Sequence, residues 1–361
     1  MRMRQDWAMI SALGLRRKIP IQSLNFPLCL APMVGLSHVA LRAVLRAYLP
    51  TGARTIWPTE MLNSRRLPHE NLAKTPETMR TADETQLVPQ ILGNDEGEIA
   101  ASLKCLESWG AEGIDINMGC PVKKALSHNY GVALMGDPEY EAEVVRICRR
   151  HTRLPISVKL RSGLENNPRF LADFVGGLEG AGASWITLHP RTAGQQRRGR
   201  ADWSQIRELR EGLGIPVIGN GDIQTVQDVV RMLEETGCEM AMAGRALAAR
   251  PWLLWQFGEK LGWPAPQGRS GPAPDSPEAE GAEYGRAALA MLQHMRVHFT
   301  DEFYLRRKYL FYVRTTSPWL RFGHDFYARS TRAKSTGELE AVASEFFSRP
   351  QEMSARTELR Q

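Results

Sequence analysis

The sequence predicts an α/β protein, a (β/α)8 TIM barrel followed by a small C-terminal all-α helical domain. Three observations lead to this prediction. Short β-branched apolar runs alternate with segments of helical periodicity, eight such units fill roughly 235 of the 361 residues, and the β signal ends near residue 260. Apolar strands that are each followed by a helix are typical of a parallel sheet covered by helices, and eight units of this length suit a barrel.

The expected strands begin near residues 28, 53, 87, 113, 155, 185, 216 and 239. The helical segments expected between them are residues 95–109, 138–151, 170–181, 203–213 and 225–235. Several of these open on an acid or proline and close on a glycine, which are ordinary helix start and stop signals. A doubly wound sheet is the competing arrangement, but the first strand-to-helix turn, APMVGLSH, lacks the glycine fingerprint of a dinucleotide fold.

The chain is expected to divide into four parts: an N-terminal extension (1–27), the barrel (28–260), a linker rich in Pro, Gly, Ser and Ala (261–283) and a helical domain (284–350). Helices are expected in that domain at 284–300, 303–315 and 335–347. The formal net charge is +6, yet residues 285–335 hold ten Lys or Arg against three acids, +7, which leaves −1 for the rest. Aromatic residues are interleaved with these basic ones, a composition that favours a nucleic-acid partner.

Other classes of protein are disfavoured by the sequence. The five cysteines are odd in number and form no CxxC pair, so we expect neither a disulfide framework nor a metal site, and a reducing compartment. The longest charge-free run, residues 19–41, contains three prolines, and the N-terminus lacks the pattern of a signal peptide. We therefore expect a cytoplasmic enzyme or binding protein with no membrane contact and no obligate protein partner.

Polar residues stand at the carboxyl ends of seven of the eight expected strands, where the active site of such a barrel lies. The glycines after strands seven and eight, Gly221 and Gly244, would let backbone N–H groups approach an anion. A phosphorylated cofactor is implied. A lone cysteine in such a protein usually behaves as a small buried hydrophobic residue. We expect this of Cys29, Cys105, Cys148 and Cys238.

Six stretches of the chain carry a family resemblance. They are APM (31–33), NMGCPVKK (117–124), SVKLRSG (157–163), LHPRTAGQQRRGRADW (188–203), IGNGDI (218–223) and MAGRAL (242–247). In this order and spacing, over about residues 28 to 335, they resemble the tRNA-dihydrouridine synthases. The resemblance implies an FMN-binding barrel that uses NADPH to reduce particular uridines in tRNA to 5,6-dihydrouridine, and a helical domain that grips the tRNA.

The resemblance also implies a role for each residue of this chain that matches a functional position of the family. Cys120 falls on the family's catalytic acid, which protonates C5 of uracil while flavin hydride reaches C6. The cofactor-binding positions are Pro32, Met33, Gln90, Lys159, His189, Asn220, Gly221, Asp222, Gly244 and Arg245. The residues expected to contact substrate or tRNA are Asn117, Arg161, Arg191, Arg197, Arg198, Arg200, Arg306, Arg307, Lys308 and Arg314.

The chain departs from the family pattern at a few places, since Ser127 to Gly131 replace a Gly-rich loop, and Pro190 and Ala246 stand where glycine is common. Two alternatives remain open. One is an FMN barrel acting on a free pyrimidine, like a dihydroorotate dehydrogenase, and the other is a non-catalytic RNA-binding protein. The first would share the FMN contacts but would not need a cationic helical domain.

Overall fold

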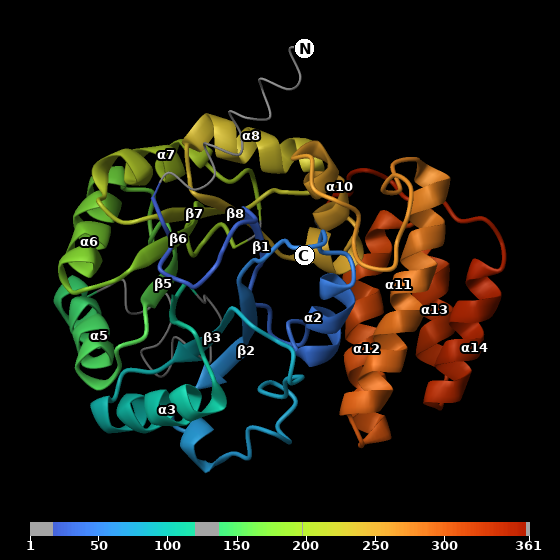
Figure 1. The fold of residues 1–361 in the computed structure, drawn as a ribbon, viewed down its shortest axis with the longest axis horizontal. Coiled ribbons are helices and arrows are strands. Elements are labelled where there is room, and N and C mark those ends of the chain that lie inside the picture. Colours follow the sequence, from blue (N-terminus) through green and yellow to red (C-terminus); the bar gives the residue numbers. More distant parts are fainter. Residues whose placement is uncertain (1–16, 120–136, 197, 359–361) are drawn as a thin grey trace.

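A computed structural model of the protein describes residues 17–119, 137–196 and 198–358. Eight parallel strands curl into a barrel in the order β1-β8-β7-β6-β5-β4-β3-β2, and a bundle of long helices lies against one side (Figure 1). The strands are β1 (Leu28–Leu30), β2 (Trp57–Asn63), β3 (Leu87–Leu92), β4 (Ile114–Met118), β5 (Ile156–Arg161), β6 (Trp185–His189), β7 (Val217–Asn220) and β8 (Met240–Ala243). The predicted barrel is confirmed.

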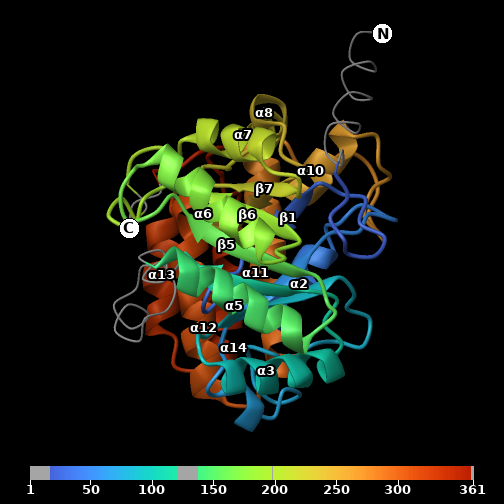
Figure 2. The same cartoon turned by 90° about the vertical axis from the view of Figure 1, so that its left-hand side faces the viewer.

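Helices cover the outside of the sheet, and α3, α5, α6 and α7 follow one another along it (Figure 2). The barrel helices are α2 (Val39–Arg46), α3 (Glu96–Trp109), α5 (Pro138–His151), α6 (Pro168–Gly180), α7 (Trp203–Gly212), α8 (Val226–Thr236), α9 (Arg245–Ala249) and α10 (Leu253–Lys260). The bundle helices are α11 (Pro277–His298), α12 (Glu302–Thr316), α13 (Gly323–Arg332) and α14 (Thr336–Phe347). Short 3₁₀ turns occur at Leu67–His69 and Ser317–Trp319.

Local sequence explains where these helices begin and end. The Asp95 side chain accepts a hydrogen bond from the Glu98 N–H, and α3 stops at Gly110, whose φ of 93° suits glycine. Thr225 and Asp228 form a reciprocal capping box at the start of α8. Helices α2, α9, α10 and α13 were not among the segments expected from the sequence, and α11 starts at Pro277, ahead of the expected residue 284.

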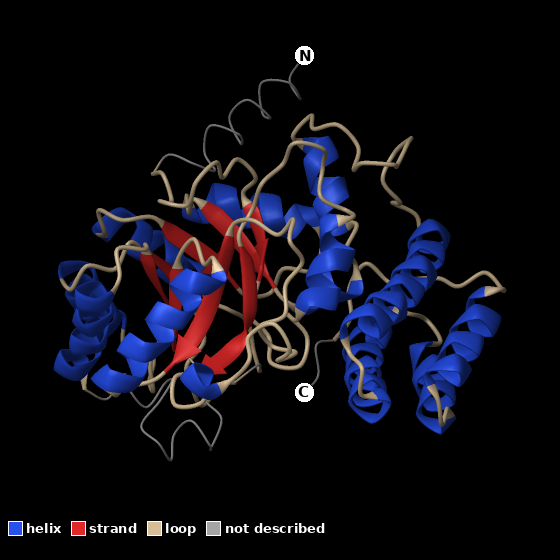
Figure 3. Ribbon diagram, turned by 60° about the horizontal axis from the view of Figure 1, so that its bottom comes forward, coloured by secondary structure: helices blue, strands red, loops and turns tan. Residues whose placement is uncertain are grey.

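The barrel interior is closed at its amino-terminal end by the segment that precedes β1. Ile19 and Ile21 are buried in one cluster with Trp185, at the first position of β6. A Cβ on Gly113, just before β4, would lie 2.8 Å from Ile21 Cδ1, so the barrel wall approaches this segment closely. The interior is therefore filled at this end, and the carboxyl ends of the strands are the expected place for a site. Figure 3 shows the barrel strands, in red, and the helical bundle at their side.

Buried polar contacts attach the helical bundle to the barrel. Helix α11 packs against α2, and two of its acids, Glu280 and Glu283, are buried. Glu280 accepts hydrogen bonds from Trp252 Nε1, at 3.1 Å, and from the Arg250 guanidinium. Glu283 pairs with Arg269 at 2.7 Å. Because a buried acid that loses its partner is costly, these contacts fix the bundle on the barrel.

The last described residues, 351–358, form a strap that returns from the bundle to the barrel. Met353 N–H donates to Pro277 O at 2.9 Å. Further along, Arg356 Nη2 lies 2.6 Å from Asp228 Oδ1 at the start of α8, and Thr357 N–H donates to Gln224 Oε1 at 3.0 Å. The strap thus ends beside the carboxyl edge of β7. No helix in the described parts of the chain is long and apolar enough to cross a membrane.

Candidate functional site

A cavity of about 200 Å³ opens at the carboxyl ends of the barrel strands. Nine of the ten expected cofactor positions line it, and the exception is Gln90. The structure therefore gathers side chains from β1, β5, β6, β7 and β8 around one space. The lining residues from the expected set are Pro32, Met33, Lys159, His189, Asn220, Gly221, Asp222, Gly244 and Arg245.

Two glycines form part of the cavity wall, and the backbone conformation requires glycine at the first of them, Gly221. Gly221 has a φ of 121°, and a Cβ there would lie 3.0 Å from both His189 Cδ2 and Ala201 Cβ. A Cβ on Gly244 would lie 3.0 Å from Met33 Sδ. Only glycine has a φ in this range without strain, and only glycine leaves the main chain exposed to the cavity. Beyond Gly244, the first turn of α9 has N–H groups without intrahelical acceptors.

His189 is neutral in this site. Burial and the nearby cations Lys159 and Arg161 lower the pKa of His189 to about 2. Arg191 Nη1 lies 3.1 Å from His189 Nε2, and since a guanidinium can only donate, Nε2 is the acceptor and Nδ1 carries the proton. The ring therefore presents an N–H donor at Nδ1 without adding positive charge to the cavity.

The buried Arg191 and the half-buried Asp222 form an ion pair on one wall of the cavity. Arg191 Nη2 lies 2.6 Å from Asp222 Oδ1, and the other carboxylate oxygen of Asp222 accepts from Ala201 N–H at 2.6 Å. Arg191 also donates to the carbonyls of Arg198 and Gly199. The expected RNA contact Arg191 is thus 5% exposed, and together with Asp222 it holds the 198–201 loop in place.

A buried hydrogen-bond network connects side chains of β3, β4 and β5 inside the barrel. Asp115 Oδ2 accepts from Gln90 Nε2 at 2.6 Å, and Asp115 Oδ1 accepts from Ser157 Oγ at 2.6 Å. The side-chain oxygen of Gln90, Oε1, accepts from Asn117 Nδ2 at 2.8 Å. Burial raises the pKa of Asp115, while these donors and Lys159 oppose the rise. Gln90 and Asn117 are therefore held in one amide orientation by the carboxyl group below them.

This network extends to the end of β4. Asn117 Oδ1 accepts from the Gly119 N–H at 3.3 Å, and Arg161 Nε donates to the Gly119 carbonyl at 3.1 Å. Asn117 and Arg161, both expected to contact substrate, are thus engaged with the backbone of the residue that precedes Cys120. Cys120 itself lies outside the described residues, as does Arg197. Among the described residues, no group of three or more His, Cys, Asp or Glu is arranged to hold a metal ion.

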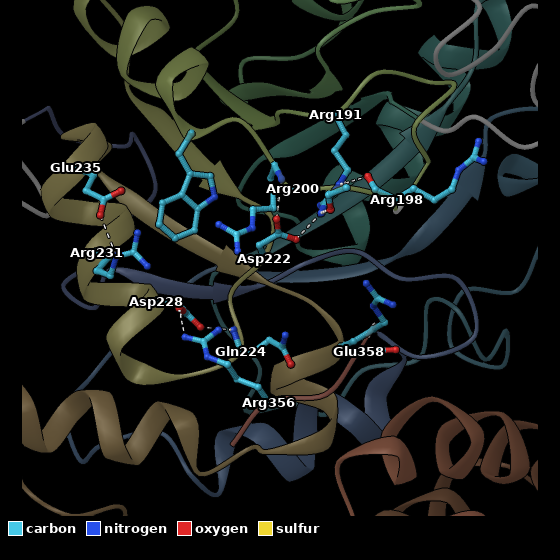
Figure 4. Close-up of a pocket in the computed structure, with 14 residues that line it drawn as sticks. Arg191, Arg198, Arg200, Asp222, Gln224, Asp228, Arg231, Glu235, Arg356 and Glu358 are labelled. Carbon is cyan, nitrogen blue, oxygen red and sulfur yellow. Dashed lines mark hydrogen bonds and ion pairs between the residues drawn. The ribbon is translucent and has the colours of Figure 1, made fainter. Parts of the chain in front are cut away.

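A second, larger cavity of about 1040 Å³ adjoins the first and shares Arg191, Asp222 and Arg245 with it. Figure 4 shows that basic side chains converge on it from the 198–200 loop, from α8 and from the C-terminal strap. The Trp203 ring lies 5.5 Å from the Arg231 guanidinium carbon. Acids line this cavity as well, and three of its arginines are paired with them: Arg191 with Asp222, Arg231 with Glu235 and Arg356 with Asp228.

The comparisons with known proteins fit this geometry. A family model for dihydrouridine synthase (Dus) matches residues 29–339. The chain belongs to the dihydrouridine synthase family. It is therefore an oxidoreductase. It is 34% identical over 223 residues to a probable tRNA-dihydrouridine synthase of Rhizobium leguminosarum bv. phaseoli, covering 62% of this chain and 69% of the relative. It is 33% identical over 247 residues to that of Rickettsia conorii, covering 68% and 73%.

Solved structures that match this dihydrouridine synthase family member share only its fold. Histamine dehydrogenase from Rhizobium sp. 4-9 superposes with a TM-score of 0.54 and 12% identity over 79% of this chain and 51% of that one. A 2-naphthoyl-CoA reductase in complex with 2-naphthoyl-CoA gives 0.52 and 11%, over 70% and 52%. Both likenesses support the barrel prediction.

The structure separates the basic residues that the family resemblance assigned to tRNA. Arg198, Arg200, Arg307 and Arg314 are exposed. Lys308 is only 8% exposed, and its Nζ lies 2.6 Å from Glu60 Oε1 in the middle of β2. Arg306 is half-buried and donates to the Ala333 carbonyl. In this conformation Lys308 and Arg306 therefore stabilise the bundle and its attachment, and the other four cations remain accessible.

Sequence reasoning missed several residues that shape the site of this family member. Asp115 is a charged residue within an apolar strand, two positions before Asn117 and therefore on the same face of β4, and that pattern could have identified it. Ser157 has the same relation to Lys159 on β5. Glu60 and the strap residue Arg356 carried no such signal, because their partners lie far away in the sequence.

Proposed function

We propose that this protein is a flavoenzyme that binds FMN, takes electrons from NADPH and reduces specific uridines in tRNA to 5,6-dihydrouridine. The observation that carries the proposal is the convergence of nine expected cofactor positions on one cavity at the carboxyl end of the barrel. The names of the relatives, probable tRNA-dihydrouridine synthases, support the same reaction.

The residues at the cavity fit a flavin mononucleotide. Gly221 and Gly244 leave main chain open to the space, and Arg245 lies at the start of α9, an arrangement suited to a phosphate. Lys159, from the middle of β5, brings a cation to the inner wall. Neutral His189 adds an N–H donor. These groups would hold the phosphate, ribityl chain and ring of the cofactor.

When bound, FMN would supply the hydride that is added to C6 of the uracil. Cys120 would hold the proton for C5 at its Sγ, which suits a thiol because its reference pKa of about 8.5 keeps it mostly protonated at neutral pH. Asn117 and Arg161 would fix the preceding peptide through Gly119 and so orient the cysteine. Base extrusion from the RNA is required, since C6 is inaccessible in a stacked strand.

Replacement of Cys120 tests this assignment. We expect Cys120→Ala to bind FMN and oxidise NADPH normally but to form dihydrouridine in unmodified tRNA at least about 100-fold more slowly, the usual contribution of a general acid. Cys105→Ala, a half-buried thiol on α3, is the matched control and should retain full activity. Undiminished product from Cys120→Ala would remove the cysteine from the mechanism.

Two measurements on the full chain test the alternatives. Turnover of free uracil or orotate with NADPH, at a rate equal to that with tRNA, would favour an enzyme of free pyrimidines. A protein that is colourless and cannot be reconstituted with FMN would favour an RNA-binding protein without catalysis. The full chain is needed because Glu280 and Glu283 of the bundle contact Arg250 and Tyr48 of the barrel, and truncation would remove these contacts.

A further inference from the structure

Helix α12 has one face in the core of the bundle and an opposite face in solvent. Tyr309 and Tyr312 are buried on the first face. On the second face, four residues at spacings of four, four and three lie in one row along the helix, as helical periodicity requires. This row, the α12 stripe, consists of Phe303, Arg307, Phe311 and Arg314.

The stripe exposes two aromatic rings that contribute little to the core. Phe303 is 71% exposed and Phe311 is 41% exposed. By contrast, Trp319 and Phe326, from the same basic segment of the chain, are fully buried. The two exposed rings therefore lie on the solvent face of α12, where a ligand can reach them.

The two arginines of the stripe are available to a ligand. Arg307 and Arg314 are exposed, and across the described parts of the chain neither has a carboxylate within ion-pair distance. Two other cations of this region are paired, Lys308 with Glu60 and Arg329 with Asp325. The only acid of α12 is Glu302, which accepts a hydrogen bond from Thr336 N–H at 2.8 Å. The stripe is therefore purely cationic and aromatic.

The stripe also leads to the cofactor cavity. A Cβ on Gly35 would lie 2.8 Å from Phe311 Cε1, so this ring rests on the turn that follows β1. Gly35 N–H donates to Glu60 Oε2 at 2.6 Å, and Glu60 pairs with Lys308 of α12. Because the same turn carries Met33 on the cavity wall, α12 is anchored directly at the rim of the site.

We propose that the α12 stripe binds a single-stranded segment of the tRNA beside the target uridine, with bases stacked on Phe303 and Phe311 and phosphates paired with Arg307 and Arg314. This inference rests on the proposed function and names the surface that presents the RNA to the cavity. Proteins bind single-stranded nucleic acid by stacking bases on aromatic rings and by pairing phosphates with basic side chains such as arginine. A protein partner would be matched less well, because an apolar contact would bury two unpaired arginines.

The spacing of the rings limits the bases that they can hold. Phe303 and Phe311 are eight residues apart, about 12 Å along the helix axis. Neighbouring bases in a stacked strand are only about 3.4 Å apart. The two rings therefore take bases that are several steps apart or splayed from the stack, as in an unpaired loop and not in a continuous duplex.

Binding of an unmodified tRNA transcript to the FMN-loaded full chain tests the proposal. Phe303→Ala and Phe311→Ala should each weaken binding by about 5- to 150-fold with an unchanged dependence on salt. Phe311→Tyr, which keeps a ring, should bind nearly as wild type. Arg307→Gln should reduce the slope of log Kd against log salt by about 0.7. Phe322→Ala, which removes a ring that is 54% exposed at the start of α13, is the matched control and should leave binding unchanged.

The outcomes separate this inference from the function on which it rests. If the phenylalanine variants bind tRNA within twofold of wild type, and wild type still forms dihydrouridine, the α12 stripe does not bind tRNA and the proposed function stands. Variants that convert a sedimenting dimer to a monomer would show instead that the stripe joins two copies of the chain. A wild-type protein that neither binds nor modifies tRNA would overturn the proposed function itself. In every variant, NADPH-driven reduction of bound FMN without tRNA should be unchanged.

Discussion

The side-chain amide of Gln90 donates to Asp115 Oδ2 at 2.6 Å, and this contact decides which end of the amide meets Asn117. Since the nitrogen is engaged below, the Gln90 oxygen faces Asn117 and accepts from it. The Asn117 oxygen is thereby turned to the Gly119 N–H. One buried carboxyl group thus orients the residues that lead to Cys120.

Removal of the Asp115 carboxyl group should loosen that arrangement. We expect Asp115→Ala to lower the free energy of unfolding by about 1–3 kcal/mol, because Gln90 and Ser157 lose a buried acceptor. Dihydrouridine formation should fall as well. Asp115→Asn keeps one acceptor oxygen and should lose less in both respects. Denaturant titration and single-turnover assays would measure this, and equal behaviour of the two variants would contradict the positioning role.

A methyl group at Gly119 should disturb the peptide before Cys120. A Cβ there would lie 3.2 Å from the Leu160 carbonyl carbon and 3.3 Å from the Arg161 nitrogen, both of them backbone atoms of β5. We expect Gly119→Ala to slow dihydrouridine formation by about tenfold or more, since a misplacement near 1 Å can cost about 100-fold. FMN content should stay normal.

Gly176→Ala is the matched control for that variant, because nothing lies within 4 Å of a Cβ at this position in α6. It should keep full activity and gain about 0.5–1 kcal/mol of stability, as alanine is favoured over glycine in a helix. Equal activity of the two variants would show that the Gly119 contact is unimportant.

The buried pair of Lys308 and Glu60 should be strongly coupled. Lys308→Met leaves Glu60 without its partner and should lower the free energy of unfolding by about 3–5 kcal/mol. The double variant Lys308→Met with Glu60→Gln should recover most of this loss. A thermal or denaturant double-mutant cycle would measure the coupling energy. A coupling near zero would indicate that Lys308 is free to reach RNA, as the family resemblance suggested.

Because Glu141 is buried, we expect the free energy of unfolding to fall as the pH rises. The carboxyl group is fully buried on α5 without a hydrogen-bond partner among the described residues, and burial raises its pKa to about 9. The folded state therefore holds a proton that the unfolded chain releases above about pH 4.5. Stability should fall as pH rises from there towards 9, by up to about 1.4 kcal/mol per pH unit.

Substitution of Glu141 tests whether this residue lowers the stability at high pH. Glu141→Met should be more stable than wild type at pH 8 and no more stable at pH 4. Glu139→Gln, an exposed acid in the same turn of α5, is the control and should not alter the profile. Denaturant midpoints between pH 4 and 9 would decide, and a flat difference between Glu141→Met and wild type would contradict the prediction.

Most of the barrel could be predicted because its signals are local. Runs such as PISVKL and WITLH, with a helix-capping residue or a glycine at each boundary, specify strands and helices through nearest neighbours alone. Helices α2, α9, α10 and α13 were missed. The residues at their N-cap positions offer no side-chain hydrogen bond to the first turn, so the usual start signal is absent. These residues are His38, Gly244, Trp252 and Phe322.

The candidate site was predictable to the extent that it lies at strand ends. Lys159, His189 and Asn220 could be placed together because the carboxyl ends of barrel strands meet at one face. Gln90 was assigned to the cofactor cavity but lies outside its lining, in the Asp115 network. The hydrogen-bond partner of a polar side chain depends on the neighbouring strands. The register between two strands cannot be predicted from the sequence of either strand alone.

The sequence by itself determined the eight-strand barrel, the family and the concentration of positive charge after residue 284, since periodicity, motifs and composition are properties of short segments. The tertiary structure alone decided what each cation does. Lys308 is adjacent in sequence to Arg307, yet it turns into the barrel to pair with Glu60, while Arg307 faces solvent beside Phe303 and Phe311. Neighbours in a helix point about 100° apart, so only the packing of α12 on β2 and the β1 turn separates a structural lysine from an accessible arginine.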